Sequence, residues 1–323
     1  MRRRDFIILL GGGTAWPLAT RAQEKGRTYR LGSLHQSPRN ASHHVAFFDE
    51  MRRLGFVEGE NLLADEHGYG LHIEELAQHA SELVRSQVDV IVCAGVAPVR
   101  AAQQATKTIP IVGNADDLVA SGLVRSLAHP EGNTTGFSIL ATELDGKRLE
   151  ILMETVPGAR NMAVLTDGRT TLPQQLEMLQ EAARTRGIDL LVCQAAKPEE
   201  IAGAIEAAKN SGTEALNVLS SGLLFNGRQI IMERVAALRI PTIYQWPTES
   251  EEGGLIAYGP RLAELYRDIT AQQVVKLLRG AKPQDLPVEQ PTKFELVINL
   301  KTAKALGIAI PQALLVAADE VIE

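Results

Sequence analysis

The amino-acid sequence predicts an α/β fold made of two Rossmann-like lobes, each built on a parallel sheet. Short apolar runs rich in β-branched residues alternate with segments of helical periodicity along most of the chain. This alternating series occurs twice in succession, and strands that alternate with helices form parallel sheets covered on both faces. The length of 323 residues also exceeds that of one typical domain.

The first series runs from about residue 28 to residue 140. The expected strands are short apolar runs, and the expected helices repeat their apolar residues every three or four positions. Strands are expected at 28–34, 60–70 (with a turn), 88–95, 109–114 and 132–140, and helices at 42–56, 72–87, 97–108 and 117–128.

The second series follows the same order. Strands are expected at 161–167, 188–195, 213–221 and 240–246, and helices at 172–187, 198–212 and 227–239. In open α/β sheets a ligand binds beyond the carboxyl ends of the strands. Two such lobes can turn these ends toward each other, so the sequence predicts a binding cleft between them.

The N-terminal segment has the pattern of an export signal. Three arginines at positions 2–4 precede an apolar stretch at 6–10 and then small residues up to Ala22. The run RRDFI at 3–7 also resembles a twin-arginine signal, although Arg2 stands where Ser or Thr is usual. We expect residues 1–22 to be a signal peptide, with a disordered basic tail as the alternative. They carry a net +3, so the remaining chain carries −9.

Composition and motifs exclude several classes of function. The charge is −6 and no basic cluster lies beyond residue 30, which argues against nucleic acid. No HExxH, GxSxG, P-loop or GxGxxG after a strand is present, so we expect no metal, no cofactor and no catalytic set. Cys93 and Cys193 end apolar runs of different lobes, and we expect both to be free.

Three segments carry a resemblance to a known family. They are IPIV…DDLVASGLVRSLAHPEGNTTGFS from residue 109, GGLIAYGP at 253–260, and LLRGAKPQDLPVEQPTKFELVINLKTAKALGIAIPQALLVAADEVIE from residue 277 to the end. These resemble the solute-binding proteins of bacterial ABC importers, type I periplasmic binding proteins related to the tryptophan/tyrosine-binding group. The resemblance implies a monomeric periplasmic protein whose two lobes, joined by three crossing segments, close on a small ligand and deliver it to a membrane permease. It divides the chain into lobe one at 28–138 and 259–288 and lobe two at 139–258 and 289–323.

Two adjacent acids, Asp116 and Asp117, follow the strand that ends at Asn114. Asp117 matches the acid of the family. A carboxylate in a desolvated cleft can pair with a ligand ammonium, and such charge-assisted bonds are about twice as strong as neutral ones. An Asp before an apolar helical pattern is also a preferred N-cap. One of the two acids could cap the helix while the other faces the cleft.

Other candidates are nominated by their place after a strand. Gly95, Val96 and Ala97 precede a helix whose first turn could receive a ligand carboxylate, although an ordinary turn is equally consistent. Tyr244 and Trp246 could form a stacking wall or belong to the core. The remaining ligand-binding candidates at strand ends are Gln36, Ser37, Asn114, Asp167, Ser220 and Ser221.

Three departures from the family pattern touch the predicted cleft. Leu118 replaces a proline after the acid, Val96 and Ala97 replace a hydroxyl residue, and Pro247 and Thr248 stand where Arg-Glu is frequent. The expected ligand is an amino acid or a carboxylate, with an aromatic group favoured. A sensor that presents its ligand to a receptor kinase is the alternative, and a secreted enzyme is disfavoured because no nucleophile–base set is visible.

Overall fold

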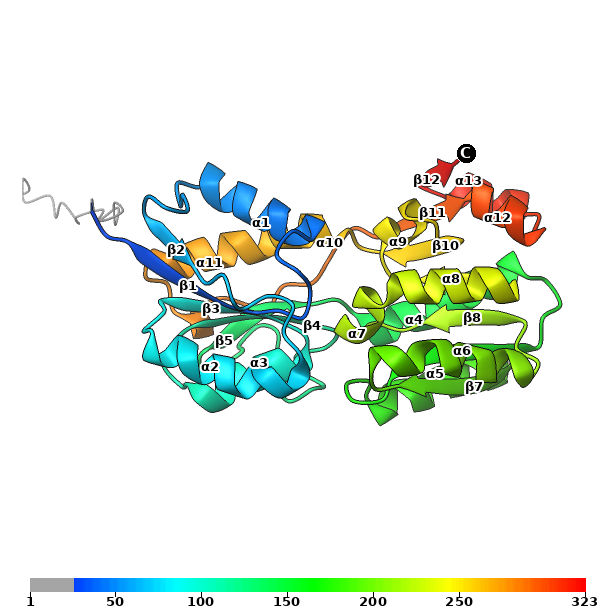
Figure 1. Cartoon of the computed structure of the whole chain (residues 1–323), viewed down its shortest axis with the longest axis horizontal. Coiled ribbons are helices and arrows are strands. Elements are labelled where there is room, and N and C mark those ends of the chain that lie inside the picture. Colours follow the sequence, from blue (N-terminus) through cyan, green and yellow to red (C-terminus); the bar gives the residue numbers. More distant parts are fainter. Residues whose placement is uncertain (1–25) are drawn as a thin grey trace, which may run out of the picture.

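A computed structural model describes residues 26–323 of the chain. The predicted export signal at residues 1–22 lies outside the described residues. The described chain forms two α/β lobes that lie side by side along the long axis of the molecule (Figure 1). The predicted fold class, two lobes with parallel sheets, is confirmed. No helix among the described residues has the length and apolar character needed to cross a membrane.

Lobe one is built from the first series and from a later helical segment. Its first part contains β1 (Tyr29–Leu34), α1 (Ser42–Arg53), β2 (Leu62–Ala64), η1 (Ile73–Glu75), α2 (Leu76–Arg85), β3 (Val90–Ala94), α3 (Val96–Ala105), β4 (Ile111–Ala115) and β5 (Thr134–Ser138). Its second part contains α10 (Leu262–Leu265), the π-helical turn η2 (Tyr266–Thr270), α11 (Ala271–Leu278) and η3 (Pro283–Asp285). Helices α1 and α11 cover one face of the sheet, and α2 and α3 cover the other (Figure 1).

Lobe two contains the second series and the C-terminal segment. Its elements are α4 (Ala141–Thr155), β6 (Asn161–Asp167), α5 (Pro173–Thr185), β7 (Asp189–Ala195), α6 (Pro198–Asn210), β8 (Ala215–Val218), α7 (Gly222–Asn226), α8 (Arg228–Leu238), β9 (Thr242–Tyr244), α9 (Pro247–Glu251), β10 (Ile256–Gly259), β11 (Glu295–Asn299), α12 (Leu300–Leu306), α13 (Gln312–Ala317) and β12 (Glu320–Ile322).

The strand orders are β2-β1-β3-β4-β5 in lobe one and β12-β11-β10-β9-β8-β6-β7 in lobe two. All pairs are parallel except β10 with β11, which is antiparallel. The described chain passes between the lobes after β5, after β10 and before β11. We propose lobe boundaries at 138/139, 258/259 and 288/289, the second of which falls one residue before the end of β10 at Gly259.

Central strands such as β3 are continuous apolar runs because both of their faces pack on helices. In β3, Val90 and Val92 belong to the core against α1 and α11, whereas Ile91 and Cys93 belong to the core against α2 and α3. Successive side chains of a strand point to opposite faces, so a sheet buried on both faces needs apolar residues at every position. Cys93 and Cys193 are both free and buried.

The prediction of a helix at 117–128 is wrong. Asp117 Oδ1 accepts hydrogen bonds from the backbone N–H groups of Val119 and Ala120, each at 2.9 Å, which starts a single helical turn. Gly122 then takes a left-handed conformation with φ 66°, and the Leu123 N–H closes the turn on the Leu118 carbonyl. A left-handed glycine ends helices, so the apolar pattern that follows stays irregular.

Gly136 of β5 sets the spacing between β5 and β4, which carries candidate site residues at its end. Its φ is 145°, and an added Cβ would lie 1.7 Å from the Gly113 carbonyl oxygen on β4. We expect Gly136→Ala to lower the free energy of unfolding by about 3 kcal/mol, because the strands must separate and the backbone is strained. Urea denaturation measures this.

The control for this substitution is Gly203→Ala on the exposed side of α6, where an added Cβ meets nothing within 4 Å. It should raise the free energy of unfolding by about 0.5–1 kcal/mol, since alanine is the better helix former. A Gly136→Ala variant as stable as the unmodified protein would contradict the role assigned to Gly136.

Candidate functional site

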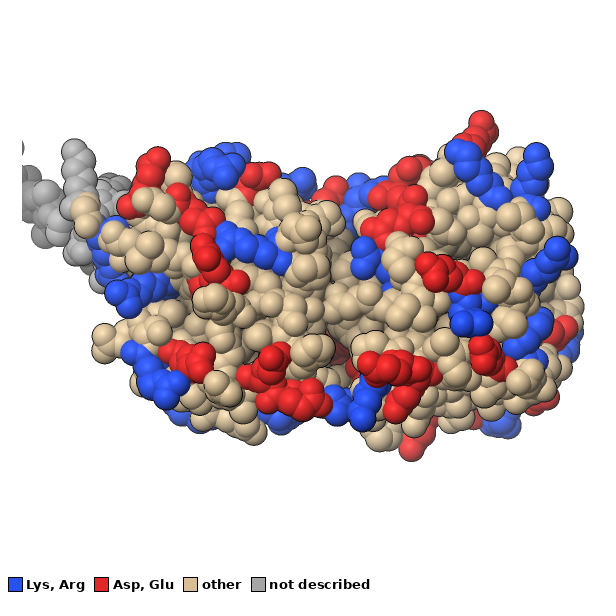
Figure 2. Space-filling view, in the orientation of Figure 1, with Lys and Arg blue, Asp and Glu red and all other residues tan. Residues whose placement is uncertain are grey.

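A cavity of about 110 Å³ lies between the lobes. A single water needs only about 10–15 Å³ measured in this way, so the cavity can hold a small organic molecule. On one face of the molecule the lobes meet along a narrow seam (Figure 2). The lining consists of Gln36, Ser37, His43, Ala94, Gly95, Val96, Ala97, Pro98, Asn114, Ala115, Asp116, Phe137, Ile139, Thr170, Ser220, Ser221, Gly222, Phe225, Trp246, Leu262 and Tyr266.

Most of the residues predicted from strand ends lie in this lining. They are Gln36, Ser37, Gly95, Val96, Ala97, Asn114 and Asp116 from lobe one and Ser220, Ser221 and Trp246 from lobe two. Each follows or ends a parallel strand, and the carboxyl ends of the two sheets face each other across the cavity. The structure therefore brings the predicted residues together, and their contact with a ligand remains a proposal.

Three predicted residues lie outside the lining, each for a physical reason. Asp117 caps the turn that begins at Val119, as described above. Asp167 is 2% exposed, and its Oδ1 accepts a hydrogen bond from the Arg169 N–H at 2.9 Å. Tyr244 is fully buried in the core between β9 and the helices of lobe two. We therefore omit these three from the proposed ligand site.

Asp116 is the acid that reaches the cavity. Its side chain faces Ser220 of the opposite lobe, which also lines the cavity. Burial raises the pKa of Asp116 to about 7; the nearby Ser220 hydroxyl opposes that rise, and the Asp145 and Asp167 carboxylates add to it. This carboxyl is thus balanced between its charged and neutral forms near neutral pH, and a neighbouring cation would hold it ionised.

Asn114 lies on β4 two residues before Asp116 and is 5% exposed. Its Nδ2 donates a hydrogen bond to Thr270 Oγ1 at 3.2 Å. Its Oδ1 has no hydrogen-bond partner within residues 26–323. A buried amide oxygen without a partner is costly, so a ligand donor at this end of β4 would satisfy it.

The helix formed by α10, η2 and α11 changes its winding at the cavity. Tyr266 and Thr270 are the first and last residues of the π-helical turn. Tyr266 lines the cavity, whereas the Thr270 hydroxyl accepts the hydrogen bond from Asn114. Turns of this type recur at functional sites because they re-aim side chains within a helix.

An aromatic wall surrounds the remaining part of the cavity. Phe137 and Tyr266 contribute from lobe one, and Phe225 and Trp246 from lobe two. The Arg228 guanidinium lies 4.6 Å from the centre of the Phe225 ring. It is held by Glu252 in two hydrogen bonds of 2.6 and 3.0 Å. The lining itself contains no Lys or Arg among the described residues, so its charge is acidic or neutral.

Three buried histidines lie beside this wall. The ring centres of His43 and His44 are 4.1 Å apart, those of His35 and His44 are 4.5 Å apart, and Tyr69 stacks on His35 at 5.3 Å. Burial lowers the pKa of His43 to about 3 and that of His44 to about 4, and it places the pKa of His35 well below its ordinary value. All three are therefore neutral at neutral pH, and His43 lines the cavity as an uncharged ring.

A buried ion pair stands behind the cavity in lobe two. Arg148 and Asp145 lie on α4, each 1% exposed, with Arg148 Nη1 2.9 Å from Asp145 Oδ1. Arg148 Nε donates to the Tyr258 carbonyl at 2.8 Å, and Gln175 Nε2 donates to Asp145 Oδ2 at 2.6 Å. Arg148 also attracts Asp116 and partly offsets the rise of its pKa. The pair therefore shapes the electrostatics of the cavity from outside it.

Comparison with known proteins identifies the family. The family model described as ABC transporter substrate binding protein matches residues 41–322. The chain belongs to this family. The resemblance drawn from the three sequence segments is thus confirmed.

Individual relatives match this substrate-binding protein over most of their length. The tyrosine-binding protein of Clostridioides difficile is 25% identical over 286 residues, which are 88% of this chain and 81% of that protein. A conserved domain protein from Vibrio cholerae is 25% identical, with a TM-score of 0.83 over 92% of this chain and all of that one. The ABC domain from Streptococcus pneumonia in complex with L-Trp is 23% identical, with a TM-score of 0.80 over 91% of this chain and all of that one.

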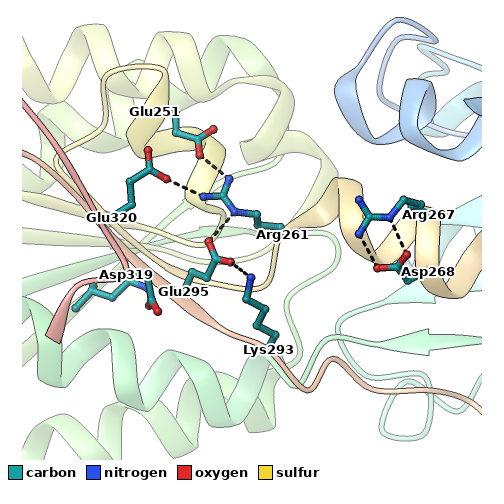
Figure 3. A network of polar contacts seen from close by, with 9 residues as sticks. Glu251, Arg261, Arg267, Asp268, Lys293, Glu295, Asp319 and Glu320 are labelled. Atoms are coloured by element: carbon teal, nitrogen blue, oxygen red, sulfur yellow. Dashed lines mark hydrogen bonds and ion pairs between the residues drawn. The ribbon is translucent and has the colours of Figure 1, made fainter.

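In this substrate-binding protein a cluster of charges joins two of the crossing segments to lobe two (Figure 3). Arg261 lies on the second crossing and contacts Glu251 of α9 at 2.6 Å, Glu295 of β11 at 2.6 Å and Glu320 of β12 at 2.9 Å. Lys293 of the third crossing contacts Glu295 at 2.5 Å. Both crossings are therefore tied to lobe two, and Arg261 directly precedes Leu262, which lines the cavity.

Proposed function

We propose that this chain is the solute-binding component of an ABC importer, which closes its two lobes on a small ligand with a protonated amine and an apolar, preferably aromatic, body. An amino acid of this kind fits best. The observation that carries the proposal is the Asp116 carboxyl, which lies in an inter-lobe cavity lined by aromatic rings.

The amine is assigned to the end of β4. Asp116 offers a carboxylate there, and the Asn114 oxygen lacks a partner among the described residues. An ammonium group has three N–H donors and would satisfy both. Two carboxylates, Asp145 and Asp167, raise the pKa of Asp116, whereas the Arg148 guanidinium lowers it, so negative charge prevails among these neighbours. A bound cation would balance this excess of negative charge.

The body and the carboxylate of the ligand are assigned to the other walls. Trp246, Tyr266 and Phe225 offer apolar faces that favour an aromatic group. The first turn of α3, at Val96 and Ala97, offers backbone N–H groups at a helix N-terminus for a carboxylate. The name of the tyrosine-binding relative, which matches 88% of this chain, supports an aromatic amino acid.

Asp116→Asn tests this assignment against Asp117→Asn. Ligands are found with a thermal-shift panel of amino acids, aromatic acids and amines, and dissociation constants are then measured by calorimetry. We expect Asp116→Asn to weaken binding of the best amine-bearing ligand by about 10–100-fold, because hydrogen bonds between charged groups contribute about 1.5–3 kcal/mol. Asp117→Asn should bind normally, since Asp117 lies outside the cavity and Asn is an equally good cap.

The affinity should also depend on pH. An ammonium pairs with ionised Asp116, whose pKa is about 7 without ligand, so affinity should fall about tenfold per pH unit below 7. Asp116→Asn should lose this dependence. Equal affinity of the two asparagine variants, or a best ligand without an amine, would refute the amine assignment and leave the binding cavity itself in place.

Delivery to a permease and residence outside the cytoplasm complete the proposal and rest on the family. Uptake of the identified ligand should fall in cells that lack this gene and recover on complementation. We also propose binding without chemical turnover, and the ligand should be recovered unchanged after prolonged incubation with the purified protein. A chemically altered ligand would point to an enzyme instead.

A further inference from the structure

Helix α7 carries ligand-facing residues and a contact to the opposite lobe on the same five-residue element. Gly222 and Phe225 line the cavity, and Ser221, which also lines it, caps the helix by accepting the Leu224 N–H at 2.9 Å. Asn226, the last residue of α7, lies outside the lining and reaches lobe one. We propose that Asn226 is the latch that couples ligand binding to lobe closure. This inference rests on the proposed function.

The latch consists of two hydrogen bonds to the loop after β1. Asn226 Nδ2 donates to the Gln36 carbonyl at 3.0 Å, and Asn226 Oδ1 accepts from the Ser37 hydroxyl at 3.1 Å. The partners are 189 and 190 residues apart in the chain and belong to different lobes. These bonds exist only while the lobes are together, so they stabilise the closed state alone.

The fit at this contact is close. An added Cβ on Gly222 would lie 2.5 Å from Gln36 Oε1. The loop at Gln36 therefore rests directly on the first turn of α7, while Asn226 holds its backbone from the last turn. A ligand that packs on Phe225 fixes the helix that carries Asn226. Ligand binding in the cavity therefore stabilises the hydrogen bonds of Asn226 to lobe one.

Two other polar contacts of the described residues join the lobes away from the crossing segments, and neither replaces Asn226. Arg169 lies 2.9 Å from Glu74, but the two side chains are 35% and 66% exposed, and such exposed pairs contribute little in water. Ser220 faces Asp116 inside the cavity, so replacing either residue also alters the ligand site. Asn226 itself lies outside the lining, so it can be replaced without deleting a residue of the ligand site; its partners Gln36 and Ser37 line the cavity and are unchanged in such a variant.

A latch of this kind has a defined signature. It shifts the equilibrium between open and closed lobes and leaves the intrinsic contacts of the ligand unchanged. Asn226→Ala should therefore raise the dissociation constant of every ligand by the same factor, about 3–10-fold, without changing their order. Asn226→Asp, which keeps the acceptor for Ser37 and loses the donor to Gln36, should show a smaller rise.

Small-angle scattering of the ligand-free proteins tests the latch without any ligand. We expect a larger radius of gyration for Asn226→Ala than for the unmodified protein, and no change for Asn210→Ala, an exposed asparagine at the end of α6. Urea denaturation should show equal stability for both variants, because Asn226 is exposed.

Unchanged scattering and affinity in Asn226→Ala would overturn the latch, and so would a changed order of ligands. These outcomes are separate from failure of the proposed function, in which the unmodified protein binds no member of the panel. Even then the scattering comparison decides whether Asn226 holds the lobes together.

Discussion

Arg148→Met is expected to lower the free energy of unfolding by about 3–5 kcal/mol, the range measured when one partner of a buried ion pair is removed. Arg148 and Asp145 are each 1% exposed. Methionine fills much of the space but leaves the Asp145 carboxylate with only the Gln175 amide as a partner. The Tyr258 carbonyl also loses the hydrogen bond that it accepts from Arg148 Nε. Chemical denaturation at pH 7 measures the loss.

Two comparisons separate the unpaired charge from a general cost of substitution. Arg184→Met removes an exposed partner of Glu181, with side chains 75% and 57% exposed, and should leave the stability nearly unchanged. The double variant Asp145→Leu, Arg148→Met replaces both charges by apolar groups and should recover most of the loss. If the double variant is as unstable as Arg148→Met, packing rather than charge explains the effect.

The site residues that could be predicted from the sequence are those that lie at the ends of strands. Parallel strands are apolar runs bounded by small and polar residues, so the positions of Gln36, Gly95 and Ser220 after such runs follow from the pattern. The geometry of open α/β sheets then brings them to one cleft. The choice between the neighbouring acids 116 and 117 did not follow, because both positions suit a cap and both suit a cleft.

A second limit on prediction from the sequence is the direction in which the side chains of a buried strand point. Tyr244 and Trp246 are two residues apart, yet Tyr244 enters the core of lobe two and Trp246 enters the cavity. Alternation reveals a face only when one face is polar, and both faces of β9 are buried. The main chain also turns after β9, where the Glu249 carboxylate accepts the N–H groups of Gln245 and Trp246, each at 3.0 Å.

Residues that enter the cavity from helices were missed for a related reason. Phe225 lies on a five-residue helix, and Tyr266 depends on a π-helical turn, neither of which has a periodic signal. His43 occupies an ordinary apolar-face position of α1. Arg148 gave no sign of burial, since an arginine on a helix is normally exposed. These placements come from packing between segments far apart in the sequence.

Lowering the pH should change the free energy of unfolding through two sets of buried groups that act in opposite directions. His35, His43 and His44 are neutral in the fold because their pKa values are lowered, to about 3 and 4 for the last two. Their contribution is present above the unfolded pKa of about 6.5 and is lost as the pH falls. At about 1.4 kcal/mol per pH unit and group, His43 and His44 together should cost about 4 kcal/mol at pH 5, and His35 acts in the same direction.

Asp116 and Glu249 act in the opposite direction. Burial raises the pKa of each to about 7, so the folded protein binds protons that the unfolded chain does not bind between pH 7 and about pH 4.5. Each should contribute about 2.7 kcal/mol at pH 5 relative to pH 8, and this contribution is lost as the pH rises through 7. The two sets nearly cancel, so we expect the unmodified protein to change little in stability between pH 7 and pH 5.

Two single substitutions should change the pH dependence of stability in opposite directions. His43→Phe keeps a ring but cannot take up a proton. The change in the free energy of unfolding from pH 7 to pH 5 should therefore be about 2 kcal/mol more favourable in this variant than in the unmodified protein. In Asp116→Asn the change in the free energy of unfolding from pH 7 to pH 5 should be about 2–3 kcal/mol less favourable than in the unmodified protein. Any cost of fitting the new side chain is the same at both pH values and drops out of the comparison. Urea denaturation at pH 7, 6 and 5 gives the three slopes, and parallel slopes would show that neither group is coupled to folding through its proton.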